Sequence, residues 1–382
     1  MAGAYIHIPF CDHICYYCDF NKVFIEGQPV DDYVDMLIRE MKMVMERYPG
    51  EKVETVYVGG GTPTSLTPAQ LTRLIAGIHR YLPCDGEFTF EANPNDLLTT
   101  DKLQALKDGG VNRLSIGVQS FDDRILKKIG RTHTSADVYK AIENARQVGL
   151  DNISIDLIFR LPGQSVENFT DSLDQAIALD LPHYATYSLI LERKTVFWNM
   201  QRKGRLHLPT QEVEAEMYQL AIDKFKAAGL HQYEISNFAK PGMESQHNLL
   251  YWQNKKYFGF GAGAYGYIGK DRYHNFGPIQ QYLTPLHDHK LPVIEHHILP
   301  ISEQIEEEMF LGLRTRYGVS IAHFQDKFKL SIAEVYGQTV PDLVKKGLLR
   351  ITPDERIVLT EKGKFLGNDV FQEFLLDEQE LI

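Results

Sequence analysis

The sequence predicts an α/β protein in which a partial (β/α)6 barrel is followed by a smaller, mainly helical C-terminal domain. Three observations lead to this prediction: six short apolar strands alternate with helical patterns, polar residues follow nearly every strand, and the pattern changes beyond Pro300. At 382 residues the chain is too long for one ordinary domain. We expect a barrel over residues 1–240, a connecting segment over 241–300 and the C-terminal domain over 301–382.

Six runs of β-branched or aromatic residues predict the strands of the barrel. Helical patterns separate these runs, so each connection is expected to be a right-handed crossover between parallel strands. Six such units favour an open barrel over a closed eight-unit barrel, and a doubly wound open sheet is the structural alternative. The predicted strands span residues 5–8, 53–58, 87–92, 113–118, 152–158 and 184–189.

The predicted helices begin and end at recognisable signals. The first spans residues 31–48 and carries its apolar residues on one face. The second begins with Thr67-Pro68-Ala69-Gln70, which combines a capping box with proline at the first helical position. Later helices are predicted over residues 101–107, 135–148 and 166–178, with Gly109 and Gly149 at C-terminal caps.

Three cysteines form a C-x3-C-x2-C run just beyond the first predicted strand: Cys11, Cys15 and Cys18. Soft thiolates favour zinc, copper(I) or iron–sulfur clusters, and three of them in one loop can hold a [4Fe-4S] cluster whose fourth iron stays open. Structural zinc is the alternative, with His7 or His13 as a fourth ligand. A metal site is therefore predicted in this loop.

Composition narrows the class of protein further. A formal charge of -11 argues against a nucleic-acid partner held through its phosphates, because such binding depends on lysine and arginine. No basic, apolar leader precedes Cys11 and no stretch approaches the ~18 apolar residues of a membrane span. The fourth cysteine, Cys84, is isolated in a predicted turn, so no disulfide framework is expected. We expect a soluble cytoplasmic protein.

Polar or glycine residues stand where the predicted strands end, which is where parallel α/β proteins place their chemistry. Gly59-Gly60-Gly61-Thr62 follows the second strand, and Glu91, Gln119 and Asp156 close the third, fourth and fifth strands. Glycines without a Cβ let a ligand approach backbone N–H and C=O groups. The alternatives are a tight turn for the glycines and hydrogen-bonded barrel residues for the polar side chains.

Four stretches together resemble the successive motifs of the oxygen-independent coproporphyrinogen III oxidase-like family of radical S-adenosylmethionine (SAM) enzymes. They are residues 5–11, 59–64, 117–121 and 156–158, within the first 240 residues. The resemblance implies a TIM-like radical SAM barrel with a [4Fe-4S] cluster on the three cysteines, to which SAM binds through its amino and carboxylate groups. It also implies the SAM-binding residues, which are Tyr5, Gly60, Gly61, Thr62, Glu91, Gln119, Arg131, Asp156 and Ile190.

One of these residues has a second interpretation. Arg131, in Gly130-Arg131-Thr132-His133, is a cation beside a predicted helix start and is equally consistent with a surface charge.

Two departures from the family pattern indicate a subfamily. The cysteine pattern of the oxidase resembles C-x3-C-x2-C-x-C, with a further cysteine two positions after the third. In this sequence that position is Phe20, whose side chain can neither ligate a metal nor exchange a proton. The stretch His247-Asn248-Leu249-Leu250-Tyr251-Trp252 matches the HN-x2-YW motif of the HemW branch, regarded as haem chaperones. Neutral imidazole can ligate haem iron and aromatic rings can cover the macrocycle, so His247 is the predicted haem residue. The alternative is a buried histidine packed against Tyr251 and Trp252.

Two smaller departures concern loop shape. Arg160 stands where relatives have glycine in the D-L-x-x-G-L-P stretch, and Tyr265 stands where many members have histidine. Tyr265 lies in Gly261-Ala262-Gly263-Ala264-Tyr265-Gly266, which spells G-x-G-x-x-G. We reject a dinucleotide site there because the segment does not open a βαβ unit, and expect the glycines to permit close backbone packing or ligand approach.

The C-terminal domain resembles a winged helix. Helices are predicted over residues 303–313, 321–328 and 340–346, and a hairpin pairs 348–351 with 356–359. Its acidic runs, at 306–308 and 377–380, make a lid or partner surface more plausible than DNA binding.

The leading functional prediction is a haem chaperone that binds haem and transfers it to an acceptor haemoprotein, using a SAM-bound [4Fe-4S] cluster. The alternative is the oxidase itself, which decarboxylates coproporphyrinogen propionates by radical chemistry. Phe20 argues against that activity, and no catalytic residue is assigned. A zinc-bound regulator with a winged helix is a third class. Contact with a membrane is expected to be peripheral and to run through the acceptor.

Overall fold

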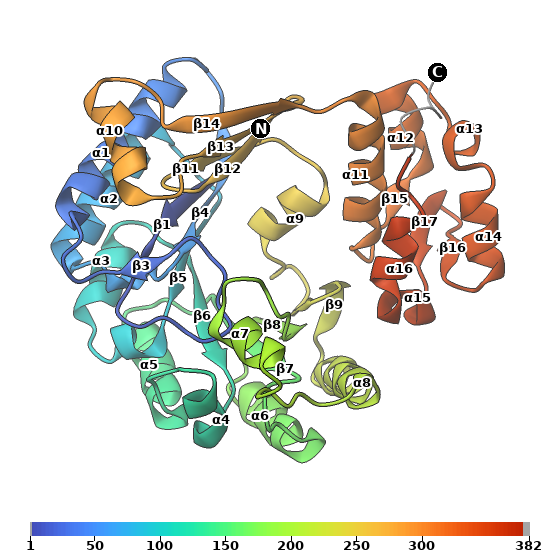
Figure 1. The fold of residues 1–382 in the computed structure, drawn as a ribbon, viewed down its shortest axis with the longest axis horizontal. Helices are drawn as coiled ribbons and strands as arrows, with labels where there is room; N and C mark the ends of the chain where they lie inside the picture. Colours follow the sequence, from blue (N-terminus) through green and yellow to red (C-terminus); the bar gives the residue numbers. More distant parts are fainter. Residues whose placement is uncertain (1, 377–382) are drawn as a thin grey trace.

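The six predicted strands form a continuous parallel run in the computed structural model, which describes residues 2–376 (Figure 1). Each lies beside the next along the chain, which confirms the repeated βα crossover. The observed bounds differ from the predicted ones by up to three residues at a strand end. The strands are β1 Ala2–Ile8, β4 Val53–Gly60, β5 Glu87–Ala92, β6 Arg113–Gln119, β7 Ile153–Phe159 and β8 His183–Ser188.

Short strands extend this run on both sides. β11 (Tyr257–Phe260) pairs with β1 in parallel, and β12 (Tyr265–Ile268), β13 (Asp271–Asn275) and β14 (Val293–Ile298) continue the sheet antiparallel. β10 (Asn237–Ala239) and β9 (His231–Glu234) follow β8. The segment over 241–300, predicted as a connection, thus supplies four strands of the barrel sheet. The domain boundary near residue 240 stays a prediction.

The complete sheet has twelve strands in the order β14-β13-β12-β11-β1-β4-β5-β6-β7-β8-β10-β9. β8 pairs with β7 and β10, and β1 pairs with β4 and β11, so the described strands do not close the barrel. The prediction of an open barrel is confirmed. A separate two-stranded ribbon joins β2 (Phe10–Cys11) to β3 (Val23–Phe24) next to the cysteine loop.

The predicted helices lie outside the sheet with small changes at their ends. The first helix ends at Met45 instead of residue 48, and Gly110, with φ +76°, takes the left-handed position after Gly109. The capping box of Thr67 and Gln70 is confirmed. Among residues 2–300, five helices were not predicted: α4 Asp123–Lys128, α7 Val196–Arg202, α8 Gln211–Ala227, α9 Gln246–Trp252 and α10 Ile279–His287. The predicted ones are α1 Val30–Met45, α2 Pro68–Tyr81, α3 Asp101–Asp108, α5 Ser135–Gln147 and α6 Val166–Ala178, with 3-10 turns η1 Pro63–Ser65 and η2 Pro94–Leu97.

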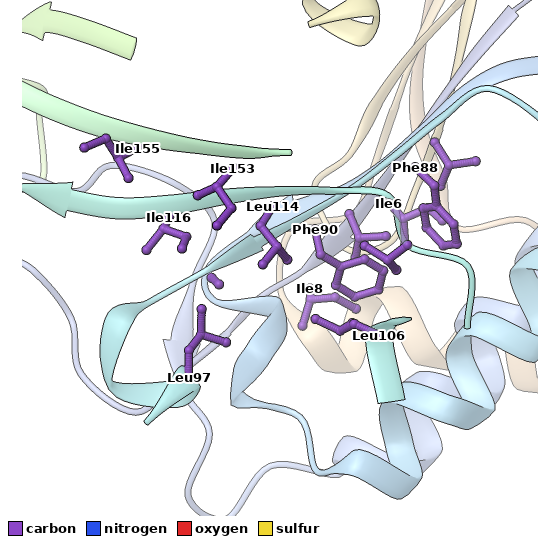
Figure 2. Packing of buried hydrophobic residues seen from close by; sticks show 14 of the residues in the cluster. Ile6, Ile8, Phe88, Phe90, Leu97, Leu106, Leu114, Ile116, Ile153 and Ile155 are labelled. Atoms are coloured by element: carbon purple, nitrogen blue, oxygen red, sulfur yellow. The ribbon is translucent and has the colours of Figure 1, made fainter. Parts of the chain in front are cut away.

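Alternation along the strands separates the core from the barrel interior, because successive side chains of a strand point to opposite faces. The core-facing positions are apolar and fully or almost fully buried, and Figure 2 shows them packed on one side of the sheet: Ile6, Ile8, Phe88, Phe90, Leu114, Ile116, Ile153 and Ile155. Each such large side chain stabilises the fold by ~1.5–3 kcal/mol. The alternate positions are polar and face the interior: Thr89, Glu91, Arg113, Ser115, Ser154 and Asp156.

The C-terminal domain has its own apolar cluster, separate from the core of the barrel. The predicted hairpin is confirmed, and a third strand joins it in the order β15-β17-β16. The elements are α11 Ile301–Leu313, β15 Val319–Ser320, α12 Ile321–Phe328, α13 Ile332–Tyr336, α14 Thr339–Lys345, β16 Leu349–Ile351, β17 Arg356–Leu359, α15 Glu361–Phe365 and α16 Gly367–Gln372. The acidic run at 377–380 lies outside the described residues. Within residues 2–376, no helix combines the length and apolar character needed to cross a bilayer.

Between these two parts lies α9 (Gln246–Trp252), drawn in yellow in Figure 1. It carries the HN-x2-YW motif and contacts both the sheet and α11.

Candidate cofactor site

A cavity of about 510 Å³ lies inside the barrel, between the cysteine loop and the polar interior faces of the strands. It brings together eleven of the residues predicted from the sequence. They are Cys11, Cys15, Cys18, Gly60, Gly61, Thr62, Glu91, Gln119, Arg131, Asp156 and Ile190. Strand ends that are far apart in the sequence thus contribute to one site, as the parallel topology requires.

The cysteines enter this cavity from β2 and the irregular loop that follows it. Thr62 Oγ1 donates to Cys11 Sγ at 3.5 Å and Arg131 Nη1 donates to Cys15 Sγ at 3.4 Å, contacts that suit thiolates. Burial raises the pKa of Cys11 to about 11, so metal binding there must displace a proton. No three metal-ligating side chains of residues 2–376 are already assembled as a ligand set. The three thiols line one cavity. In a [4Fe-4S] cluster each thiolate binds a different iron, so the thiols need not converge on a single metal ion.

The glycine loop lies against the first cysteine. Gly60 has φ +118°, a left-handed conformation that favours glycine, and a Cβ there would lie 2.5 Å from the His7 ring. A Cβ on Gly61 would lie 2.9 Å from Cys11 Sγ, while the Gly61 N–H donates to Ile8 O at 2.8 Å. The glycines therefore provide close packing around the cysteine as well as a turn, and they leave backbone atoms at the cavity wall.

Two partly buried carboxyl groups face the same space. Glu91 accepts hydrogen bonds from Tyr57 OH at 2.7 Å and from Gly60 N–H at 3.0 Å. Burial, and then the nearby charge of Glu91, raise the pKa of Asp156 to about 7. Burial also raises the pKa of Glu91. Perturbed carboxyl groups in a cavity mark a functional site, and these would interact favourably with a cationic ligand.

Arg131 is held inside the site, so the surface-charge interpretation is wrong. Its Nη2 donates to Asn93 Oδ1 at 2.8 Å and also to the Gly117 carbonyl oxygen. Asn93 Nδ2 in turn donates to Thr62 Oγ1 at 3.0 Å, which links the arginine to the glycine loop.

Gln119, at the end of β6, lies at a β-bulge and has φ +68°, an uncommon conformation for a residue other than glycine. Strain of this kind clusters at functional sites.

Of the predicted SAM residues, Tyr5 lies outside the cavity and Ile190 lies at its mouth. Tyr5 is not among the described residues that line the cavity; its hydroxyl contacts His7 Nδ1 at 2.9 Å, and Tyr57 lines the wall beside it. Ile190 does line the cavity but is 69% exposed, which places it at the mouth. Other residues that line the cavity were not predicted from the sequence, among them Tyr57, Thr89, Asn93, Ser115 and Tyr187. Alternation along β5 from the predicted Glu91 would have pointed to Thr89 and Asn93, two residues before and after it.

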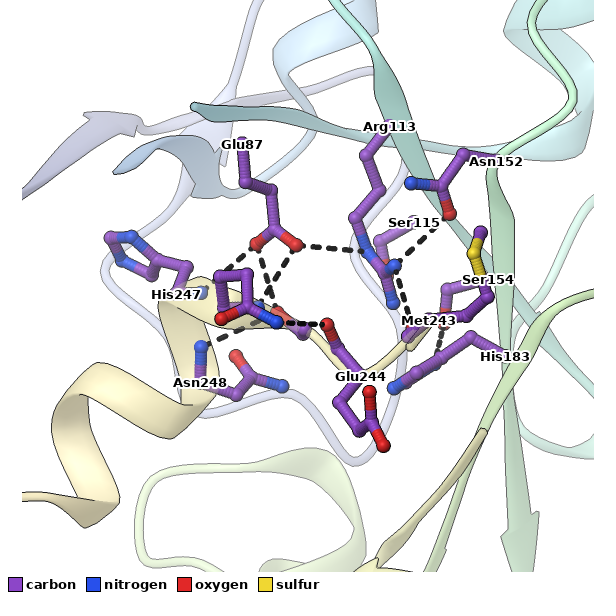
Figure 3. Close-up of polar contacts among 12 residues, drawn as sticks. Glu87, Arg113, Ser115, Asn152, Ser154, His183, Met243, Glu244, His247 and Asn248 are labelled. Carbon is purple, nitrogen blue, oxygen red and sulfur yellow. Dashed lines mark hydrogen bonds and ion pairs between the residues drawn. The ribbon is translucent and has the colours of Figure 1, made fainter. Parts of the chain in front are cut away.

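His247 lies at the opposite end of the barrel, in a polar cluster at the start of the strands (Figure 3). Its Nδ1 lies 2.8 Å from Thr55 Oγ1 and its Nε2 lies 2.8 Å from Tyr251 OH. Burial lowers its pKa to about 3, so the ring is neutral. Glu87 accepts the N–H of His247 at 3.0 Å and fixes the N-terminus of α9. A bond from iron to either ring nitrogen would replace one of the two side-chain contacts.

The two loop departures have structural reasons. Arg160 has φ +63°, the left-handed conformation that favours glycine, and its Nε lies 3.1 Å from Glu214 Oε2. Tyr265 stacks on His274 with ring centroids 3.9 Å apart. The G-x-G-x-x-G stretch joins the antiparallel strands β11 and β12, so rejecting a dinucleotide fold is confirmed. A Cβ on Gly261 would lie 2.5 Å from His7 O, which confirms close packing.

Comparisons with known proteins agree with this geometry. Residues 5–176 match the radical SAM superfamily, and residues 299–366 match the HemN C-terminal domain. The heme chaperone HemW of Bacillus subtilis (strain 168) is 51% identical over 98% of this chain and 99% of its own length. The heme chaperone HemW of Lactococcus lactis is 48% identical over 98% of both chains.

A more distant relative and a solved structure extend the comparison. Radical S-adenosyl methionine domain-containing protein 1, mitochondrial, from Mus musculus is 35% identical over 91% of this chain and 81% of its own. The solved structure of coproporphyrinogen III oxidase (HemN) from Escherichia coli superposes with a TM-score of 0.85 over 98% of this chain and 90% of that chain. At 23% identity, this likeness shows a shared fold.

Proposed function

Since the chain belongs to the HemW family of radical SAM proteins, we propose that it binds haem and transfers it to an acceptor haemoprotein. The observation that carries this proposal is the 51% identity to a heme chaperone over 98% of the chain. The similarity therefore includes the barrel, the α9 motif and the C-terminal domain. The acceptor is proposed only as a class, a haemoprotein in its haem-free form.

The family implies SAM and a [4Fe-4S] cluster, and the residues of the barrel cavity fit both. The three thiols of Cys11, Cys15 and Cys18 line the cavity and leave a fourth ligand position to another molecule. When bound, the cluster with SAM supplies one-electron chemistry at an open iron. We assign to this chain the work of holding the cluster through its thiolates, in a cavity whose wall carries hydrogen-bond donors to sulfur.

The same cavity offers partners for the charged groups of SAM. We propose that backbone groups of Gly60, Gly61 and Thr62 bind its amino and carboxylate end, because this edge lies beside Cys11. Glu91 and Asp156 are partly buried carboxyl groups suited to its cationic groups. Gln119, Arg131 and Ile190 complete the pocket, whereas Tyr5 acts through its contact with His7.

The fold of the E. coli oxidase supports one second candidate, decarboxylation of a porphyrinogen. Phe20 argues against it, because this side chain lines the cavity mouth and is 58% exposed where the oxidase pattern has a cysteine. A phenyl ring provides neither a ligand nor a proton. The two candidate functions share the cluster and SAM. They are distinguished by the fate of the tetrapyrrole, which a chaperone transfers unchanged and an oxidase decarboxylates.

The experiment follows both outcomes on one anaerobically reconstituted preparation. Haem binding is measured by titration of the Soret band, and transfer by the spectrum of an apo-haemoprotein added afterwards. Coproporphyrinogen III, reductant and SAM are supplied in parallel, and decarboxylated porphyrin is measured. We expect about one haem per chain, transfer to the acceptor and no decarboxylated product. Robust decarboxylation with no stoichiometric haem binding would overturn the proposal in favour of the oxidase.

A further inference from the structure

Asn93 connects the two hydrogen bonds that the cavity wall donates to cysteine sulfurs. It stands between β5 and η2, and its side-chain amide contacts Arg131 on one side and Thr62 on the other. Arg131 Nη1 donates to Cys15 Sγ at 3.4 Å, and Thr62 Oγ1 donates to Cys11 Sγ at 3.5 Å. One amide therefore contacts the donors to two of the three thiols that line the cavity.

We propose that Asn93 is a positioning residue that aims these two donors at the cluster sulfurs and thereby raises the reduction potential of the cluster. The inference rests on the proposed function, because it assumes a [4Fe-4S] cluster on the three cysteines. Hydrogen bonds to the sulfurs are among the properties that set the potential of such a cluster, since they stabilise the extra negative charge of its reduced form. The role needs no contact between Asn93 and SAM.

The direction of each hydrogen bond in this chain follows from what the groups can donate. The guanidinium of Arg131 only donates, so the Asn93 atom that lies 2.8 Å from Nη2 must be the acceptor Oδ1. The amide nitrogen Nδ2 then faces Thr62 Oγ1 at 3.0 Å and donates to it. Because this nitrogen accepts no hydrogen bond, the single hydroxyl hydrogen of Thr62 is left for Cys11 Sγ. The arginine thus fixes the direction of every bond as far as the sulfur of Cys11.

The local sequence explains why the amide of Asn93 turns into the cavity. Asparagine at a helix N-cap commonly accepts a backbone N–H of its own helix, but Asn93 makes no such bond to η2. Pro94 restricts the residue before it to extended conformations, and Asn93 has φ -99° and ψ 147°. An extended backbone continues the alternation of β5, so Asn93 lines the cavity together with Thr89 and Glu91.

Burial gives these contacts weight. Thr62 is 4% exposed and Cys11 is 6% exposed, so little water competes for the hydroxyl hydrogen. A hydrogen bond is electrostatically stronger in such an interior than in water. Arg131 carries a permanent positive charge, and its Nη2 also donates to the Gly117 carbonyl oxygen. This second contact keeps the guanidinium inside the cavity when Asn93 is replaced, so the substitution changes its direction and not its presence.

The first test uses full-length, anaerobically reconstituted protein without SAM, so that a contact between Asn93 and SAM cannot contribute. A redox titration followed by electron paramagnetic resonance measures the reduction potential of the cluster. In Asn93→Ala we expect the ratio of reduced to oxidised cluster at a given potential to fall about tenfold, which is about 59 mV for a one-electron couple. Iron and sulfide per chain are measured alongside.

Asn95→Ala is the matched control. Asn95 is the same residue type on the same turn, η2, but it is exposed and is not among the described residues that line the cavity. Its Nδ2 donates to Thr132 Oγ1 at 2.7 Å, so this variant also removes one side-chain hydrogen bond. We expect the wild-type potential. An equal fall in both variants would assign the effect to a general loosening of η2 and would contradict the proposal.

Asn93→Asp separates the direction of the hydrogen bonds from the packing of the side chain. A carboxylate has the same shape as the amide but only accepts, so Thr62 would donate to it instead of to Cys11 Sγ. We expect the potential to fall at least as far as in Asn93→Ala. A role in packing alone predicts the opposite order, because aspartate fills the space that alanine leaves empty.

A double-mutant cycle tests whether Asn93 acts through Thr62. Thr62→Val removes the hydroxyl and keeps the branched shape, and it should lower the potential by itself. If Asn93 acts through this hydroxyl, Asn93→Ala should lower the potential less in the Thr62→Val background than in the wild-type chain. Strictly additive shifts would show that Asn93 does not act through Thr62.

The outcomes separate this inference from the proposed function. A wild-type chain that forms no cluster contradicts the cofactor assignment of the proposed function, and the role of Asn93 fails with it. A full cluster in every variant, at the wild-type potential, overturns the role of Asn93 alone. If Asn93→Ala holds less iron and sulfide than the wild-type chain, Asn93→Asp and Thr62→Val decide, because both keep the side-chain volume. Lowered potentials in these two variants support the proposal, and unchanged potentials contradict it.

Discussion

The carboxylate of Glu91 accepts a hydrogen bond from the backbone N–H of Gly60 at 3.0 Å. This contact ties the end of β5 to the left-handed glycine at the end of β4, where φ is +118°. It therefore sets the direction of the backbone that continues past Cys11. Glu91, which was predicted as a SAM-binding residue, therefore also fixes the backbone of Gly60 at the cavity wall.

We expect Glu91→Ala to weaken SAM binding by roughly tenfold or more. A hydrogen bond to a charged group contributes about 1.5–3 kcal/mol, and about 1.4 kcal/mol corresponds to a factor of ten in affinity. Equilibrium dialysis of SAM against reconstituted protein measures the effect. Glu212→Ala, on the exposed first turn of α8, is the control. Unchanged SAM affinity in Glu91→Ala would separate this carboxylate from the SAM site.

Replacing Cys11, Cys15 or Cys18 by serine should abolish the iron–sulfur cluster, because each removes one of three thiolates and the cavity supplies no other. Cys84→Ser should retain it. The Cys84 thiol donates to Glu54 O at 3.2 Å and lies outside the cavity. Iron and acid-labile sulfide per chain, after anaerobic reconstitution, distinguish these variants. A full cluster in any one of the three serine variants would exclude that cysteine as a ligand.

The affinity for SAM should rise roughly tenfold between pH 6 and pH 8. The pKa of Asp156 is raised to about 7, so its carboxyl is mostly neutral at pH 6 and mostly ionised at pH 8. The ionised form attracts the cationic groups of SAM, and the raised pKa of Glu91 acts in the same direction. Asp156→Asn should flatten the profile measured by SAM titration. A profile of unchanged steepness would assign the titration to another group.

The raised pKa of buried Glu40 leads us to expect that the free energy of unfolding depends on pH. Burial raises its pKa to about 7, although Gly261 N–H and Tyr282 OH donate to its carboxyl. Between the unfolded pKa of about 4.3 and 7, the folded state binds more protons, so stability falls as pH rises through this window. The loss reaches up to about 4 kcal/mol and levels off above pH 7.

Urea unfolding at pH 5, 6, 7 and 8 tests this sign. Glu40→Gln should remove the downward trend that the wild-type chain shows between pH 5 and pH 7. Glu46→Gln, on an exposed side chain just beyond the same helix, should keep it. A trend that survives in Glu40→Gln would have a different origin.

Local patterns were enough to predict the parallel strands and most helix ends. The strands were recognisable from runs of β-branched and aromatic residues, and the helix at Pro68 from the reciprocal bonds that Thr67 and Gln70 could form. The clustering of Glu91 and Asp156 followed from topology, since both lie on parallel strands of one sheet, β5 and β7, which are separated only by β6.

Other features depended on residues distant in the sequence. The environment of Arg131 is set by Asn93 and Gly117, and that of His247 by Thr55, 192 positions away. A local motif cannot state whether a histidine nitrogen is free or already engaged. The strands from β9 to β14 are three to six residues long, which is too short for alternation to identify them.

The N-terminal strand has one early neighbour and one late neighbour. β1 pairs on one side with β4, at residues 53–60, and on the other with β11, where Gly3 stands opposite Tyr257. During synthesis on the ribosome, β1 would therefore keep an unpaired edge until more than 250 residues had been made. The cysteine loop directly follows this strand, so late pairing also delays the point at which its surroundings become rigid. A chain truncated before β11 should aggregate through that edge, even though every cysteine of the loop is present.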